Sequence, residues 1–202
     1  MSTESRRLDS VCVYCGSSNA ADPEFLKAAF DFGGELARAG LRMVYGGGGV
    51  GLMGECARGA HEAGGRVLGI IPSFLTDRER QYDLVETVVV ESMHERKMML
   101  FEESDAFVVL PGGVGTLEEI VELLSWRRMD LHNKPVVFYD PRDFWKPLYD
   151  LFQHTVDEKL SPPDFMGAWR STSDIQQIIP LLREIAGEAP IDPDEATLTQ
   201  LT

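Results

Sequence analysis

The stretch Ala106–Glu119, AFVVLPGGVGTLEE, decides the fold of this chain. It begins with an apolar run, Phe107-Val108-Val109-Leu110, as expected of a parallel strand that is covered on both faces. A glycine-rich turn follows, and Thr116 then opens a long amphipathic stretch. A buried strand that runs through glycines into a helix is the repeating unit of α/β proteins.

The same unit recurs along the chain. Apolar runs predict strands over Val11–Tyr14, Arg42–Tyr45, Arg66–Ile71, Thr87–Val90, Ala106–Leu110 and Pro135–Tyr139. The stretches between and after them predict helices over Pro23–Ala39, Gly51–Ala63, Met93–Glu103, Thr116–Leu131, Trp145–Glu158 and Ser173–Ile185, the last one bent or interrupted at Pro180. This alternation predicts the α/β class: a single-domain Rossmann-like open parallel sheet with helices on both faces.

The two ends of the chain differ from the stretch between them. Residues 10–186 show no linker and no internal repeat, so we expect one folded domain there. We expect residues 1–9 to be disordered. Residues 187–202 are small, acidic and proline-containing, which predicts a flexible acidic tail.

Composition narrows the possible partners. The formal net charge of −14 disfavours binding to nucleic acid backbones and to anionic membranes. No apolar run is long enough to span a membrane, and the polar N-terminus lacks a secretory signal, so we expect a cytoplasmic protein. A phosphorylated ligand is still compatible with this charge, because backbone amides at a helix end bind anions locally.

The three cysteines do not suggest a disulfide framework. Cys12 and Cys15 form a CxxC pair, but they lie in and directly after a predicted strand, whereas a redox pair opens a helix. No second ligand pair accompanies them for zinc. We therefore interpret Cys12, Cys15 and Cys56 as buried small side chains, with redox or metal chemistry as the weaker alternative, and expect no metal site.

Glycine or small polar residues follow three of the predicted strands, in Cys15–Ser18, Gly46–Gly51 and Pro111–Thr116. Glycines allow close approach of a ligand, and the amides of a following helix favour an anion. Three such loops at one edge of a sheet predict a phosphorylated ligand. The Gly49-x-Gly51-x-x-Gly54 spacing matches a dinucleotide fingerprint, but the next strand ends in Pro72-Ser73 without the acidic residue that holds a ribose.

Thr116 and Glu119 allow two interpretations. In the first, the Thr116 hydroxyl and the amides of Gly113, Gly115 and Thr116 hold a phosphate, with Glu119 one turn later on the same side. In the second, Thr116-x-x-Glu119 is an ordinary capping box. The two compete, because a bound phosphate would take the amides that the cap uses.

A second unusual pair precedes this loop. Arg96 and Lys97 lie near the start of a predicted helix, where positive charges oppose the helix dipole. A local rule broken in this way often marks a functional site. The alternative is that both cations pair with Glu102, Glu103 or other surface acids.

These segments resemble the motifs of a known family. Pro111–Glu119 matches a PGGxGTxxE motif, and Met93-His94-Glu95-Arg96-Lys97 matches its companion motif. Both are characteristic of the LOG ("Lonely guy") cytokinin riboside 5'-monophosphate phosphoribohydrolases, formerly labelled lysine decarboxylases, and the likeness extends from Val11 to about Ile185. The resemblance implies a Rossmann-like nucleotide-binding catalytic domain, usually dimeric. It also implies that the enzyme, without a cofactor, splits AMP or N6-modified AMP, such as isopentenyladenosine monophosphate, into free base and ribose 5-phosphate.

The resemblance also implies which residues form the site. Arg96 and Glu119 correspond to the catalytic pair of the family. The resemblance and the glycine loops together predict these substrate-binding residues: Gly16, Ser17, Gly47, Glu79, Lys97, Gly112, Gly113, Gly115, Thr116, Glu118 and Ser125. The match at Glu79 is looser than the others, because the loop 72–84 differs from the family. The decarboxylase label fits poorly, because Lys97 lies beside Arg96 as in an anion-binding pair rather than as a Schiff-base lysine.

Hydrolysis of a ribosyl C1'–N9 bond builds positive charge on the sugar. We assign to Glu119 the stabilisation of that charge and the activation of water, and to Arg96 the orientation of Glu119 and substrate binding. Two alternatives stay open. A non-catalytic nucleotide-binding carrier module needs the phosphate loop but not this pair, and an NADPH-dependent oxidoreductase predicts a bound dinucleotide and no release of base.

Overall fold

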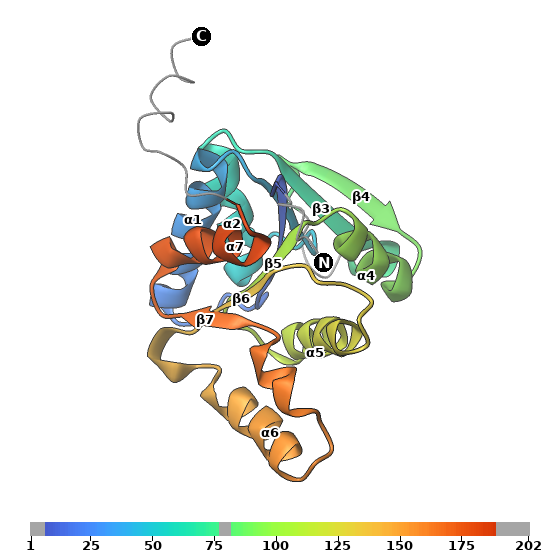
Figure 1. The fold of residues 1–202 in the computed structure, drawn as a ribbon. Coiled ribbons are helices and arrows are strands. Elements are labelled where there is room, and N and C mark those ends of the chain that lie inside the picture. The colour runs from blue at the N-terminus through green and yellow to red at the C-terminus, as the bar shows by residue number, and fades with distance from the viewer. Residues whose placement is uncertain (1–6, 77–81, 189–202) are drawn as a thin grey trace.

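The computed structural model describes residues 7–76 and 82–188. Within these ranges the chain forms a seven-stranded parallel sheet in the order β4-β3-β2-β1-β5-β6-β7 (Figure 1). The strands are β1 (Ser10–Tyr14), β2 (Arg42–Tyr45), β3 (Val67–Pro72), β4 (Glu86–Val90), β5 (Ala106–Val109), β6 (Val136–Tyr139) and β7 (Arg170–Thr172). The predicted open parallel sheet is therefore confirmed.

Helices cover both faces of the sheet, as predicted (Figure 1). They are α1 (Pro23–Arg38), α2 (Gly51–Glu62), α4 (Met93–Glu102), α5 (Val114–Arg128), α6 (Lys146–Asp157) and α7 (Ile178–Ala186). Short 3₁₀ segments lie at Ser73–Leu75, Pro141–Asp143, Pro163–Gly167 and Ile175–Gln177. In the described ranges, no helix has the length and apolar content needed to cross a membrane.

The side chains of β1 show how the two layers form. Val11, Val13 and Cys15 join the core cluster beneath α1, α2 and α7, whereas Cys12 and Tyr14 join the cluster beneath α4, α5 and α6. Successive strand residues point to opposite faces, so a strand covered on both sides needs an unbroken apolar run. This explains why the central strands could be predicted from their hydrophobicity.

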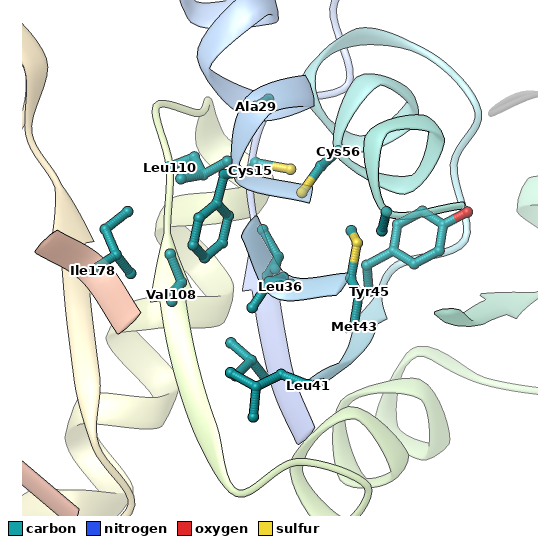
Figure 2. Packing of buried hydrophobic residues seen from close by; sticks show 14 of the residues in the cluster. Cys15, Ala29, Leu36, Leu41, Met43, Tyr45, Cys56, Val108, Leu110 and Ile178 are labelled. Carbon is teal, nitrogen blue, oxygen red and sulfur yellow. The ribbon is translucent and has the colours of Figure 1, made fainter. Parts of the chain in front are cut away.

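Figure 2 shows the first of these clusters, in which side chains from both the sheet and the helices meet. Leu36 of α1, Cys56 of α2 and Ile178 of α7 contribute to the same core as Met43 and Val108 of the sheet. All five are fully buried. The cluster fixes α1 and α2 against the central strands, and with them the loops at the ends of those strands.

The three cysteines belong to the packed interior. Cys12, Cys15 and Cys56 are free and buried, and burial raises the pKa of each thiol well above its ordinary range. The side chains of Cys15 and Cys56 point toward each other between β1 and α2 (Figure 2). Their prediction as buried small side chains is confirmed.

The C-terminal part of the predicted domain differs from expectation. The helix predicted over Ser173–Ile185 is instead a 3₁₀ turn, Ile175–Gln177, followed by α7, and Pro180 interrupts neither. Pro180 lies in the first turn of α7, where its missing N–H has no intrahelical partner to lose. The edge strand β7 was not predicted at all.

The folded region reaches slightly beyond residues 10–186. Leu8 is buried in the first core cluster, and its N–H donates to the carboxylate of Glu188. Gly187 ends α7 in the left-handed conformation that glycine adopts without strain. The remaining residues of the expected disordered N-terminus and tail, 1–6 and 189–202, lie outside the described residues.

Candidate active site

The candidate site lies where the strand order reverses. The chain moves outward from β1 to β4 on one side of the sheet and from β5 to β7 on the other, so the loops after β1 and β5 diverge at their carboxyl ends. Open parallel sheets bind ligands at such a crevice. The two loops are linked at their base, where the N–H of Gly16 donates to the carbonyl of Pro111 at 3.1 Å.

The N-terminus of α5 differs from those of its neighbours at this edge. The side chains of Asp22, Asn19 and Ser92 accept hydrogen bonds from first-turn amides of α1, α2 and α4, respectively. The N-cap of α5 is Gly113, which has no side chain that could cap the helix. First-turn amides lack intrahelical acceptors and carry the positive end of the helix dipole, so this end is suited to an anion.

Thr116 does not cap α5, so the predicted capping box is wrong. The helix begins at Val114, two residues earlier than predicted, and Thr116 is buried within its first turn. Its side chain packs onto Gly112, where an added Cβ would lie 2.2 Å from the Thr116 Oγ1. Glu119 is therefore not held at the surface as a capping partner, and it is only 7% exposed.

Arg96 reaches the site from α4. Ser92 caps this helix: its Oγ accepts from the N–H of Glu95 at 3.1 Å. Arg96 follows at once, is 4% exposed, and donates from Nη2 to the carbonyl of Gly46 at 3.0 Å. A Cβ on Gly46 would lie 2.0 Å from that nitrogen, so the second glycine loop makes room for the arginine.

The suggested pairing with acidic side chains is present for Lys97, which pairs with Glu118 and Glu122, but no ion pair between Arg96 and Glu102 or Glu103 is found among the described residues. Glu103 pairs instead with Arg42 at 2.7 Å, while Arg96 points inward to Gly46. Burying a guanidinium and a carboxylate at the same sheet edge costs free energy, unless polar groups or a ligand compensate the lost hydration of the two charges.

A cavity of about 330 Å³ brings the two charged groups together. Its lining comprises Cys15, Gly16, Ser17, Ser18, Met53, Met93, Arg96, Gly113, Val114, Gly115, Thr116, Glu118 and Glu119. The electrostatics agree with this placement: besides burial, the negative charge of Glu119 raises the pKa of the Cys12 thiol, and the positive charge of Arg96 lowers it. Both charges therefore lie near enough to β1 to act on Cys12.

Lys97 has a different environment from Arg96. Its Nζ donates to Glu118 at 2.7 Å and to Glu122 at 2.9 Å, both on α5. The side chain is 16% exposed, and the two carboxylates hold the pKa of Lys97 above its ordinary value, the bond to Glu118 having the largest effect. Lys97 is not among the residues that line the cavity.

Several predicted site residues lie away from this cavity. Gly47 has a φ of +79°, and a Cβ there would lie 2.9 Å from Ile71, so both the backbone conformation and the packing favour glycine at this position. Gly112 faces Thr116 and lines a neighbouring cavity, and Ser125 is exposed nearly two turns beyond Glu119. Glu79 lies outside the described residues.

Sequence reasoning missed five of the lining residues. Met53, Met93 and Val114 are apolar residues in first turns of helices, and Cys15 and Ser18 flank residues that were predicted. Met93 stands in the companion motif three residues before Arg96, a spacing that places both on one helix face. That spacing was the available signal for Met93.

A larger cavity of about 500 Å³ lies at the opposite end of α5, between Arg127, His132 and Phe165. It contains none of the predicted site residues. The smaller cavity at the strand ends is the better candidate, because it alone of the two holds the buried Arg96 and Glu119.

Comparison with known proteins points to the same segments. The family model described as "Possible lysine decarboxylase" matches residues 53–182. A cytokinin riboside 5'-monophosphate phosphoribohydrolase from Rhodococcoides fascians is 39% identical over 176 residues, which cover 86% of this chain and 89% of that protein. LOG5 of Arabidopsis thaliana, which has the same name, is 38% identical over 174 residues, covering 86% of this chain and 76% of its own length.

Solved structures share the fold. A molybdenum cofactor binding protein from Rippkaea orientalis has a TM-score of 0.67 and 26% identity, covering 89% of this chain and 98% of its own. The molybdenum cofactor carrier protein from Chlamydomonas reinhardtii has a TM-score of 0.68 at 22% identity, covering 90% of this chain and 100% of its own. The likeness to the second protein concerns the fold alone.

Proposed function

Because the chain belongs to the LOG family of cytokinin riboside 5'-monophosphate phosphoribohydrolases, we propose that it hydrolyses the N-glycosidic bond of AMP and N6-modified AMP. The products are the free base, adenine or a cytokinin, and ribose 5-phosphate. The observation that carries the proposal is the cavity in which buried Arg96 and Glu119 stand beside the uncapped N-terminus of α5.

The 5'-phosphate docks at the first turn of α5. The amides of Val114, Gly115 and Thr116 supply hydrogen-bond donors there, and the helix dipole favours the negative charge. Gly113 and Gly115 have open space where a Cβ would lie, which leaves the backbone accessible. Fixing the phosphate also fixes the ribose, and so places the anomeric carbon in the cavity.

Glu119 stabilises the positive charge that develops on the ribose and activates the attacking water. It lies one turn beyond the phosphate-binding amides, on the wall of the cavity. Arg96 binds substrate and orients Glu119, since its own position is fixed by the carbonyl of Gly46.

Release of base from AMP tests this proposal. The protein is incubated with AMP or isopentenyladenosine monophosphate, and chromatography detects free base. We expect Glu119→Gln to lower kcat by about 10²-fold or more while AMP binding is retained, because removing a catalytic acid–base group costs ~10²–10⁴-fold. Full turnover by this variant would remove Glu119 from the chemistry. Binding of AMP without release of base by the unaltered protein would support a carrier.

We also propose a homodimer. Exposed apolar residues lie on α5 and at its C-cap, namely Val114, Val121 and Met129, and they suit a contact between subunits. Sedimentation of the purified protein at the mass of a single chain would contradict this. A nucleotide substrate also fits the cytoplasmic location expected from the sequence.

A further inference from the structure

Two pairs of residues lie opposite each other on α4 and α5. Arg96 and Glu119 line the cavity, and the residues beside them in sequence, Lys97 and Glu118, bond to each other at 2.7 Å. Neighbours in a helix point about 100° apart, so one pair faces the cavity while the other closes its edge. The distance between Arg96 and Glu119 therefore depends on the contact between Lys97 and Glu118.

Lys97 makes this contact with two carboxylates at once. Glu122 lies one turn after Glu118 on α5, and the Lys97 Nζ donates to it at 2.9 Å. Exposed ion pairs contribute little, but the Lys97 side chain is only 16% exposed and its charge is shared in a network. Such a contact holds the two helices at a defined separation.

The same contacts argue against Lys97 as a phosphate ligand. A phosphate that bound Lys97 would approach Glu118 and Glu122, and like charges repel. Lys97 also lies outside the cavity lining, whereas the amides of α5 face into it without a side-chain cap.

We propose that Lys97, Glu118 and Glu122 form a brace between α4 and α5 that positions Arg96 and Glu119 for catalysis. Lys97 and Glu122 are thus positioning residues. The inference rests on the proposed function, because the brace acts on that reaction. It predicts a larger effect on kcat than on KM, since the first-turn amides of α5 bind the phosphate, Arg96 adds only part of the substrate binding, and a displacement of about 1 Å costs roughly 10²-fold in rate.

The test compares Lys97→Gln, Lys97→Arg and Glu122→Gln. We expect kcat for AMP to fall at least tenfold in Lys97→Gln and Glu122→Gln, with KM within about threefold of the unaltered protein, and Lys97→Arg to restore most of kcat. Asp150→Asn is the matched control, because it breaks the exposed ion pair between Lys146 and Asp150 on α6. It should leave both constants unchanged.

A phosphate ligand at position 97 predicts the opposite pattern. Lys97→Gln would then raise KM, and Glu122→Gln would lower it by releasing the lysine from a competing carboxylate. That result, or unchanged kcat in both variants, would overturn the proposal.

A measurement without turnover separates the brace from the proposed function. If the two residues act as a pair, the losses in Tm of Lys97→Gln and Glu122→Gln should not add in the double variant. Additive losses would refute the brace even in an active enzyme. Absence of base release by the unaltered protein would instead refute the proposed function, and the Tm comparison would still decide whether the brace exists.

Discussion

The missing side chain at Gly46 determines where Arg96 lies. The Gly46 carbonyl accepts from the Arg96 Nη2 at 3.0 Å, and the space that a Cβ would fill is occupied by the same nitrogen. The clash would be with the far end of a flexible side chain rather than with backbone. A methyl group there should therefore displace the arginine without unfolding the protein.

We predict that Gly46→Ala lowers kcat/KM by about 10²-fold through misplacement of Arg96, with little change in Tm. Gly59→Ala is the matched control, because its Cβ would lie 2.0 Å from the carbonyl of Phe30, a backbone atom that cannot move freely. It should lower stability by roughly 1–3 kcal/mol and leave kcat of the folded enzyme unchanged. Steady-state kinetics and thermal unfolding distinguish the two. Equal loss of activity in both variants would contradict the assignment.

Residue types and motif spacing predicted Arg96 and Glu119, but not the surroundings of either. Thr116-x-x-Glu119 has the pattern of a capping box, yet the helix begins earlier because Gly113, which has no side chain, takes the N-cap position. Thr116 is buried because its side chain packs onto Gly112, and no local sequence pattern predicts this contact. Lining residues such as Met53 look like ordinary apolar helix positions until the loops around them are folded.

Among the elements, α5 has a titratable anchor at its C-terminal end. Its C-terminal end is held by His132, whose Nε2 lies 2.9 Å from the carbonyl of Leu123 and whose Nδ1 accepts from the N–H of Lys134 at 3.2 Å. These roles require the neutral ring with its proton on Nε2. Burial, with the charges of Arg127 and Lys134 adding to it, lowers the pKa of His132 below its ordinary value of 6.5.

Stability should therefore depend on this histidine at mildly acid pH. Because the pKa of His132 is lower in the folded protein, the unfolded chain takes up a proton first as the pH falls below 6.5. The stabilisation from the neutral ring is therefore lost progressively as the pH falls from 6.5 to the pKa of His132 in the folded protein. We predict that Tm falls more steeply between about pH 7 and 5 in the unaltered protein than in His132→Gln. Parallel curves of Tm against pH would contradict this.

The edge strand β7 is the element that the sequence pattern did not predict. The central strands are unbroken apolar runs, but β7 is Arg170-Ser171-Thr172, which has no apolar residue. It is a strand because it pairs with β6 at the sheet edge, where one side is open to solvent. Tertiary pairing, not local hydrophobicity, determines such short edge strands.

The whole molecule combines a strongly negative charge with a site for an anion. The net charge of −14 repels phosphates at long range. Within the cavity, however, the first-turn amides of α5 and the buried guanidinium of Arg96 offer local positive charge beside the carboxylates of Glu118 and Glu119. The sheet order makes this possible, because it brings the loops after β1 and β5 and the first turns of α4 and α5 to one edge.

The docking of the nucleotide phosphate at α5 can be seen in a crystal structure of the Glu119→Gln variant with AMP. We expect phosphate oxygens at hydrogen-bond distance, about 2.7–3.2 Å, from the amides of Val114, Gly115 and Thr116, with the side chain at position 119 facing the anomeric carbon. A phosphate bound elsewhere, for example beside Arg127 in the larger cavity, or a side chain at position 119 turned away from the ribose, would contradict it.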